Sequence, residues 1–239
     1  MTSEAYAVKC LSWNINGSFT NKIPILDDVF EQNEVVCLQE HFVTSRSKSI
    51  LSFNSSVSVY SVSAKQLSGK GRPSGGIATF VRSTLRSSVF EVNDNFLAIR
   101  VEGCVFINVY LPTNYHDERS ERAFTYSSDK LGQCINRIRS LSLQCILVGD
   151  FNCDLNEPLL SRSLRSTLLL SIFGDQFDLK CKDLNFTHVH TSMSTSEVDH
   201  AVASINLRIL PVKVVLDFQL SDHLPIQFSA EIPCHSSDT

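Results

Sequence analysis

Acidic, amide and histidine side chains recur at the ends of predicted strands along this chain. The clearest case is residues 144–152 (QCILVGDFN), in which the apolar run 145–148 predicts a buried strand that Gly149 ends. A carboxylate, Asp150, and an amide, Asn152, follow at once. Strand ends are where rigid sheets position catalytic groups, but an Asp-x-Asn pair is also a common turn former. Taken alone, this segment is better explained as a turn. The recurrence of the same pattern elsewhere in the chain favours a catalytic or binding site.

The same kinds of side chain follow or interrupt other apolar runs. They are Asn14, Glu40, Tyr110, Asn114, Asp199, Asp222 and His223. Each has an ordinary structural explanation, since Asn14 and Asp222 can cap turns, Glu40 can be a solvated strand end and Tyr110 can pack in a core. A lone histidine such as His223 is more often a satisfied surface residue than a catalyst. Together, however, these side chains supply oxygen ligands for Mg²⁺, an Asp-His pair and amide donors, which metal-assisted phosphodiester hydrolysis requires.

Apolar periodicity predicts the elements that carry these residues. Strands are predicted at residues 8–13, 35–38, 57–62, 77–81, 88–92, 96–101, 105–110, 145–148, 186–190, 198–203, 207–216 and 225–232. Helices are predicted at residues 23–30, 45–53, 119–141 and 159–173. Residues 65–76 (KQLSGKGRPSGG) and the Ser/Thr-rich residues 191–197 are predicted loops. A strand-helix-strand start followed by many strands indicates two packed sheets with helices outside.

Composition is typical of a soluble globular protein, with 43% hydrophobic and 19% charged residues in 239. We expect one domain over residues 1–232 and a disordered tail at 233–239, which is also where a longer polyprotein could have been cut. No signal peptide is recognisable, and no stretch approaches the ~18–20 consecutive apolar residues of a membrane helix. We therefore expect an intracellular protein without membrane contact.

The cysteines and the net charge exclude other classes of protein. There are eight cysteines, with no C-x-x-C pair and no zinc-ligand spacing, so reduced core thiols are expected. The net charge of −4 argues against a protein that coats nucleic acid by bulk charge. A local basic rim around an acidic, metal-bearing site remains compatible with that charge.

The ordered motifs LSWNING, LQE, NVYLPTN, GDFN, SEVDH and SDHLPI resemble those of the endonuclease/exonuclease/phosphatase superfamily. The superfamily includes abasic-site endonucleases, deoxyribonuclease I, sphingomyelinases and inositol-polyphosphate phosphatases, and the resemblance extends from Trp13 to Ile226. It implies a DNase I-like fold, a four-layer α/β/β/α sandwich of two packed, mainly antiparallel sheets. Within the superfamily the chain is most similar to the apurinic-like endonuclease domain of non-LTR (LINE-type) retrotransposons. The compact length, the SGGIATFVR stretch after a basic loop and the SEVDH motif carry that likeness.

The chemistry and the resemblance together imply a metal centre and a water-activating group. Glu40, assisted by Asn14, would hold a divalent ion, Mg²⁺ with Mn²⁺ as the alternative, and Asp222 would sit near it. Asp150 would orient or deprotonate the attacking water. Asn152 would donate to a phosphate oxygen.

The same resemblance implies the groups that contact the phosphate and the DNA. His223 would stabilise the developing charge, and Asp199 would orient its ring, as in a triad without a nucleophilic serine. Donors to phosphate oxygens would be Tyr110, Asn114 and Thr187, with Ser196 supporting the His223 side and Lys70 and Arg72 meeting the DNA backbone.

The expected activity is nicking of double-stranded DNA to leave a 3′-hydroxyl that primes target-primed reverse transcription. The expected partner is the reverse transcriptase region of the same polyprotein, and the place of action is the nucleus. An abasic-site repair endonuclease is the first alternative, although repair enzymes more often carry an Arg-Ile-Asp-Tyr-like sequence where this chain has Val198-Asp199-His200. A phosphatase or sphingomyelinase-type hydrolase of small phosphoesters is the second. A catalytically dead binding module is disfavoured, because every catalytic position that can be mapped holds a competent residue.

Overall fold

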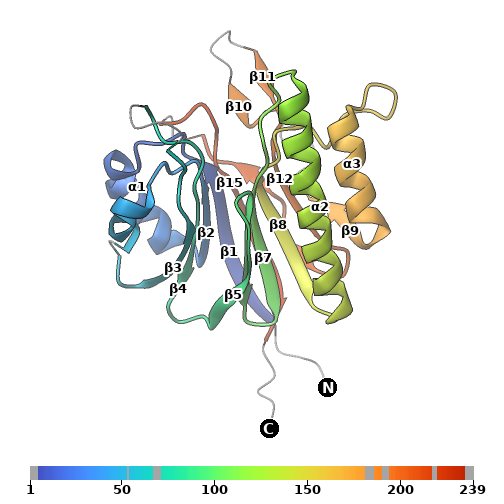
Figure 1. The fold of residues 1–239 in the computed structure, drawn as a ribbon. Coiled ribbons are helices and arrows are strands. Elements are labelled where there is room, and N and C mark those ends of the chain that lie inside the picture. Colours follow the sequence, from blue (N-terminus) through green and yellow to red (C-terminus); the bar gives the residue numbers. More distant parts are fainter. Residues whose placement is uncertain are drawn as a thin grey trace.

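Two β-sheets pack face to face at the centre of the molecule, with helices on their outer faces (Figure 1). This computed structural model describes residues 5–52, 54–66, 71–180, 186–189, 194–216 and 220–234. Helix α1 covers one sheet, and helices α2 and α3 cover the other (Figure 1). The arrangement is the four-layer α/β/β/α sandwich that the sequence predicts.

The first sheet has the strand order β13-β15-β1-β2-β4-β3, with β14 also paired to β15. Its strands are β1 (Ala5–Asn14), β2 (Val35–Gln39), β3 (Val57–Val62), β4 (Ile77–Arg82), β13 (Arg208–Ile209), β14 (Lys213–Val214) and β15 (Ile226–Pro233). Strands β1 and β2 are parallel and are connected by α1 (Phe19–Gln32), whereas the other pairs are antiparallel. A 3₁₀ segment, η1 (Ser45–Ser52), follows β2.

The second sheet has the order β5-β6-β7-β8-β12-β9. Its strands are β5 (Ser87–Val92), β6 (Phe96–Val101), β7 (Cys104–Tyr110), β8 (Gln144–Asp150), β9 (Phe177–Leu179) and β12 (Asp199–Ser204). The long helix α2 (Glu118–Ser140) connects the parallel strands β7 and β8, and α3 (Leu164–Phe173) and η2 (Gly174–Gln176) follow β8. A small antiparallel hairpin, β10 (His188–Val189) and β11 (Thr195–Ser196), projects beside the end of β12 (Figure 1).

Three apolar clusters hold the layers together. One fills the space between the sheets, with Cys10, Phe106 and Phe228 among its members. The others lie under α2 and α3 and under α1. Burying this apolar surface is the main favourable term in folding, at roughly 25 cal/mol per Å². The strand ends are thereby fixed on a rigid double sheet.

Gly149 does not end its strand, as the sequence suggests, but lies inside β8. Its φ of 142° and its packing explain why glycine is present, since a Cβ there would lie 2.1 Å from the Val109 carbonyl oxygen of β7. The parallel pairing with β7 therefore continues as far as Asp150, opposite Tyr110. The strand end that presents the carboxylate is placed by this close backbone contact.

Other departures from the predicted elements have local causes. The helix predicted at 159–173 begins at Leu164, because the Ser163 hydroxyl accepts from Ser166 N and caps it there. The strand predicted at 207–216 is divided into β13 and β14 on either side of Pro211, which has no N–H to donate. The predicted helix at 45–53 is the 3₁₀ segment η1, with residue 53 outside the described residues.

Two short strands lie where no strand was predicted. The chain forms β9 after α3, and β11 within the predicted loop 191–197. The strand predicted at 186–190 shortens to β10, and residues 190–193 lie outside the described residues. Among the helices that the structure describes, none has the length and apolar character needed to cross a membrane. The described cysteines are free thiols, and all except Cys234 are buried.

Candidate active site

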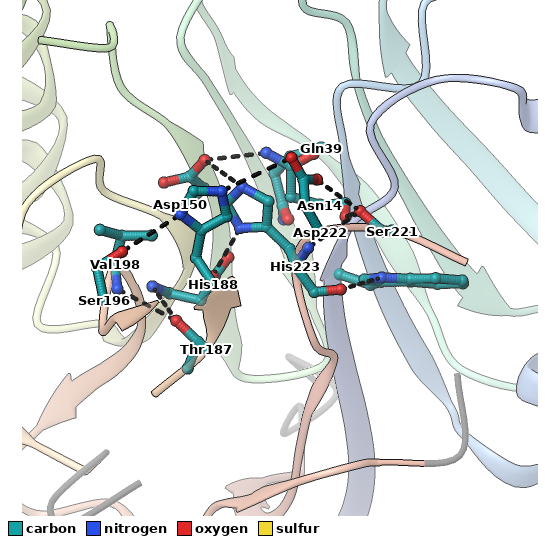
Figure 2. A network of polar contacts seen from close by, with 12 residues as sticks. Asn14, Gln39, Asp150, Thr187, His188, Ser196, Val198, Ser221, Asp222 and His223 are labelled. Carbon is teal, nitrogen blue, oxygen red and sulfur yellow. Dashed lines mark hydrogen bonds and ion pairs between the residues drawn. The ribbon is translucent and has the colours of Figure 1, made fainter. Parts of the chain in front are cut away.

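Polar side chains from both sheets meet at one edge of the sandwich (Figure 2). Asn14 ends β1 and Glu40 directly follows β2, so the parallel pairing of these strands brings the two residues side by side. In the other sheet Asp150 ends β8, and antiparallel pairing places the first residue of β12, Asp199, opposite it. The site therefore lies across the seam between the two sheets.

One amide group joins two carboxylates across this seam. Asn14 Nδ2 donates to Glu40 Oε1 at 3.0 Å and to Asp150 Oδ2 at 2.9 Å. Its Oδ1 accepts a hydrogen bond from Asn16 N at 3.0 Å, which fixes the orientation of the amide. Because the nitrogen faces both carboxylates, Asn14 aligns them, and its oxygen points to the backbone rather than to a shared metal position.

The donor set fits a divalent metal ion. Glu40 and Asp150 each direct a carboxylate oxygen at the Asn14 amide nitrogen, and carboxylate oxygens are the ligands that Mg²⁺ and Mn²⁺ prefer. Burial raises the pKa of Asp150 to about 7, and the nearby Asp199 also raises it, against the opposing effect of His223. A cation beside these carboxylates would offset the desolvation and repulsion that raise this pKa.

The buried carboxylate of Asp199 accepts a hydrogen bond that lies in the plane of the His223 ring. Its Nδ1 donates to Asp199 Oδ2 at 2.9 Å, and its Nε2 lies 3.9 Å from Asp150 Oδ2. Trp13 Nε1 donates to the His223 carbonyl oxygen at 3.0 Å and anchors its backbone. Burial lowers the pKa of His223, but Asp199, Asp150 and Asp222 together raise it to about 10. The ring is therefore a cationic donor at neutral pH.

Asp222 contacts a second histidine rather than the two aligned carboxylates. Its Oδ1 accepts from Asn16 Nδ2 at 2.9 Å, and its Oδ2 lies 3.6 Å from His188 Nε2. Hydrogen bonding from His188, and then from Asn16, holds the pKa of Asp222 well below its usual range. Within the described part of the chain, it clusters with His188 and His223 as possible metal donors, one atom of each lying within 4.8 Å of the others.

Tyr110 and Asn152 lie beside the carboxylates. The Tyr110 hydroxyl hydrogen-bonds to Glu40, and burial, followed by the charges of Glu40 and Asp150, raises its pKa strongly. Asn152 N donates to Asp150 Oδ1 at 2.8 Å, and its side-chain Nδ2 donates to the Leu111 carbonyl at 2.8 Å. Asn152 therefore orients Asp150 through its backbone.

The residues expected to donate to phosphate divide into buried and exposed ones. Thr187 is fully buried, and its Oγ1 accepts from Val198 N at 3.1 Å and Asp199 N at 3.0 Å. These contacts position Asp199 and leave Thr187 without access to a phosphate. Asn114 is exposed, and its Oδ1 accepts from His116 N at 2.8 Å in a local turn. The residue that hydrogen-bonds to the Tyr110 hydroxyl from this segment is Thr113, which the sequence interpretation did not single out.

The remaining predicted contacts lie at the rim. Arg72 stacks on Phe42, with its Cζ 4.2 Å from the ring centroid, and its Nη2 donates to Asn16 Oδ1 at 2.6 Å. Ser196 Oγ lies 3.3 Å from His188 Nδ1. Lys70 lies outside the described residues.

His188 and Asn16 are site residues that sequence reasoning missed. The sequence offered two signals for them, an imidazole inside the strand-like FTHVH segment and the second asparagine of the NING motif. Neither signal shows which partner the side chain meets, because Asp222 and His223 are distant in sequence. His188 meets His223 through the tertiary pairing of β10 with the loop before β15, and Asn16 meets Asp222 through a hydrogen bond between residues far apart in sequence.

Comparisons with known proteins show the family and the fold of this chain. The chain matches the Endonuclease/Exonuclease/phosphatase family over residues 11–223. No match to a curated protein sequence was found. At sequence identities this low, the solved structures that follow demonstrate a shared fold.

An AP endonuclease from Leishmania major has a TM-score of 0.77 and 14% identity, over 95% of this chain and 88% of that one. The catalytic domain of Xenopus laevis APE2 has a TM-score of 0.73 and 17% identity, over 95% and 94%. A 3′-5′ exonuclease from Neisseria meningitidis has a TM-score of 0.72 and 17% identity, over 92% and 98%. With the family match spanning most of its length, the chain belongs to the Endonuclease/Exonuclease/phosphatase family of divalent-metal-dependent phosphoester hydrolases.

Proposed function

We propose that this protein is a Mg²⁺-dependent endonuclease that nicks duplex DNA and leaves a 3′-hydroxyl able to prime reverse transcription. The observation that carries the proposal is the position of Asp150, which lies between the Asn14 amide and the His223 ring at the seam of the sheets. DNA is supported as substrate by the names of similar structures, which include AP endonucleases and a Neisseria 3′ phosphatase bound to a DNA hairpin.

The metal, held by Glu40 and Asp150, would neutralise charge on the scissile phosphate. Asp150 accepts a proton from water as the water oxygen attacks phosphorus. The P–O3′ bond breaks, which leaves a 5′-phosphate and a 3′-oxygen that takes a proton from solvent. Asn14 and Asn152 keep the Asp150 carboxylate aimed at the phosphate.

His223 supplies positive charge to the phosphate oxygens. Asp199 holds the ring through Nδ1, so the remaining nitrogen, Nε2, faces the Asp150 side of the site. A preorganised cationic donor stabilises charge that develops in the transition state, and it needs no reorganisation when the reaction occurs. Tyr110, whose pKa burial raises, keeps its proton and can donate it in a hydrogen bond.

A repair enzyme that cuts at abasic sites is the second candidate, because AP endonucleases are among the structures of the same fold. Both activities break the same bond with the same residues. They differ in whether an intact nucleotide next to the scissile phosphate is accepted. The first candidate, the nicking endonuclease, also includes a role in retrotransposition. We propose that it is a single domain over residues 1–232, that it acts in the nucleus, and that its partner is a reverse transcriptase in the same polyprotein.

The two candidates separate when one preparation is assayed on three substrates. These are an intact supercoiled duplex, a duplex with one abasic site and the soluble diester bis-p-nitrophenyl phosphate, each with Mg²⁺, Mn²⁺ or EDTA. We expect nicking of the intact duplex with either metal, and a DNA polymerase should extend the nicks directly, which identifies a 3′-hydroxyl. Cleavage confined to the abasic duplex would favour repair. Cleavage of the soluble diester alone would overturn both proposals, and Glu40→Ala controls for contaminating nucleases.

A further inference from the structure

The ring of His188 lies against the ring of His223. Their centroids are 4.3 Å apart and the ring planes differ by 32° (Figure 2). The Asp199 hydrogen bond restrains His223 within the plane of its ring, but a hydrogen bond at Nδ1 does not by itself fix the tilt of the ring about that bond. His188 restrains this tilting, because its ring contacts the face of the His223 ring.

His188 is itself contacted at both of its ring nitrogens. Its Nε2 lies 3.6 Å from Asp222 Oδ2 and its Nδ1 lies 3.3 Å from Ser196 Oγ on β11. Asp222 is in turn fixed by Asn16 at 2.9 Å. Only 17% of the His188 side chain is exposed. A flat ring that is largely buried in this way can act as a wall for its neighbour.

Backbone hydrogen bonds make His188 and His223 parts of one unit. Val189 N donates to the Asp222 carbonyl at 2.8 Å, and Leu224 N donates to the Thr187 carbonyl at 2.7 Å. These bonds flank the two histidines, which face each other as an antiparallel bridge. A displacement of the β10–β11 hairpin would therefore reach His223 through both the backbone and the stacked ring.

The same stacking argues against a shared metal ion at His188, Asp222 and His223. Nitrogen lone pairs lie in the ring plane, and planes only 32° apart direct them side by side rather than toward one ion. A 2.0–2.1 Å coordination distance from both rings would require one of them to turn away from its present partners. The arrangement suits a restraint better than a ligand set.

We propose that His188 is a positioning residue, which holds the His223 imidazole at the angle that faces Asp150 and links that angle to the β10–β11 hairpin. The kinetic part of this inference rests on the proposed phosphodiester hydrolysis. The structural part concerns only the His223 ring and can be measured without substrate. Misplacing a catalytic group by about 1 Å can cost on the order of 10²-fold in rate.

Two variants and one control isolate the role of the ring. His188→Ala removes the wall, whereas His188→Phe restores a flat ring without the nitrogens that contact Asp222 and Ser196. Val189→Ala is the control, because it shortens an exposed side chain on the same strand and leaves the His188 ring in place. Thermal melting identifies any variant that does not fold.

The first measurement is nuclear magnetic resonance of the His223 Nδ1 proton in metal-free protein. We expect this proton to exchange with water about tenfold faster or more in His188→Ala, and close to wild type in His188→Phe and Val189→Ala, because ring tilting exposes the Asp199 bond. Unchanged exchange in His188→Ala would overturn the proposal. Equally fast exchange in Val189→Ala would assign the effect to the hairpin as a whole and would overturn it as well.

The second measurement is steady-state cleavage of duplex DNA. His188→Ala should lower kcat by about 10- to 100-fold with little change in KM, and His188→Phe should recover most of the loss. A loss found in KM alone would show that His188 binds substrate and would contradict a positioning role. If the wild-type protein cleaves no DNA, the proposed function fails, and the proton-exchange result still decides the role of His188.

Discussion

His223 Nδ1 lies 2.9 Å from Asp199 Oδ2, and this hydrogen bond joins the loop before β15 in one sheet to the start of β12 in the other. Both side chains are largely buried. A charge-assisted hydrogen bond in such surroundings is stronger than one at the surface, and removing one partner leaves the other charge unsatisfied. The bond therefore couples the relative position of the two sheets to the orientation of the His223 imidazole.

The first prediction follows from that coupling. If Asp199 acts only through His223, then Asp199→Asn and His223→Ala should each reduce DNA cleavage, by roughly 10²–10⁴-fold for the histidine. The double variant should be barely slower than His223→Ala, because groups that act as a unit are non-additive. Rates measured for all four proteins complete the cycle. Losses that multiply would mean that Asp199 has a separate role, such as contact with the metal.

The second prediction concerns Glu40. Glu40→Ala should abolish metal-dependent cleavage and leave the fold intact, because this side chain is only partly buried and lies outside the apolar clusters. Glu31→Ala removes an exposed glutamate from α1 and serves as the matched control. Circular dichroism checks folding and a nicking assay with added Mg²⁺ checks activity. Retained nicking by Glu40→Ala would remove this residue from the metal site.

The third prediction separates metal binding from catalysis. A ligand that binds only the folded state raises the melting temperature, by an amount that grows with its concentration above Kd. Mg²⁺ or Mn²⁺ should therefore raise the melting temperature of the wild-type protein measured against EDTA. The rise should disappear in Glu40→Ala and persist in His223→Ala, since the imidazole cation is not expected to bind the ion. An equal rise in all three proteins would indicate that the metal binds elsewhere.

The sequence was sufficient to predict the layers and most of the longer strands, because these depend on local pattern. Strands such as β6 and β7 are apolar runs, and parallel strands place their ends at one edge whatever the details of packing. The two-residue strands β10, β11, β13 and β14 have no period long enough to detect. Gly149 was misinterpreted because glycine signals a turn, and only the neighbouring Val109 carbonyl shows that a close backbone approach requires it.

The sequence predicted which residues gather in the candidate site better than it predicted the hydrogen bonds between them. Asp150, Asp199 and His223 meet as the motif order suggests. The orientation of the Asn14 amide and the pairing of Asp222 with His188 depend on hydrogen bonds between residues far apart in sequence. No spacing rule reveals such partners, so the sequence alone did not show that Asp222 contacts His188.

The fourth prediction uses the pKa of Asp150. An unfolded aspartate titrates near pH 4, whereas burial raises the folded value to about 7. Between these values the folded protein binds the extra proton, so the free energy of unfolding contributed by Asp150 decreases as pH rises from about 4 to 7. Asp150→Asn, which cannot ionise at this position, should not show this decrease in the free energy of unfolding.

The melting temperatures of both proteins in EDTA test that reasoning. The difference, variant minus wild type, should increase from pH 5 to about pH 8 and then level off, because one unit above its folded pKa Asp150 is nearly fully ionised in both states. A difference that stays constant with pH would mean that burial does not raise the pKa of Asp150. Added Mg²⁺ should reverse the order of the two proteins, because the ion stabilises only the carboxylate form.

The last prediction concerns where DNA selectivity lies. Groups that contact phosphate and metal carry no sequence information, so selectivity must come from segments that reach base edges or read DNA shape. Arg72 is held at the rim by Phe42 and Asn16. We expect it to contact the DNA backbone. Arg72→Ala should weaken binding equally across DNA sequences and reduce its dependence on salt by about one unit of slope.

The β10–β11 hairpin should behave differently, because it is bonded directly to the loop that carries His223 and so lies close to the scissile phosphate. Exchanging residues 191–195 for a Gly/Ser linker of equal length should redistribute nick positions on a long duplex, while metal-dependent cleavage survives. Sequencing of nick ends for wild type, the exchange and Arg72→Ala makes the comparison. If the hairpin determines selectivity and Arg72 only binds the DNA backbone, only the linker-exchanged protein should show a new pattern of nick positions. The wild-type pattern in the exchanged protein, or a new pattern in Arg72→Ala, would place selectivity outside the hairpin.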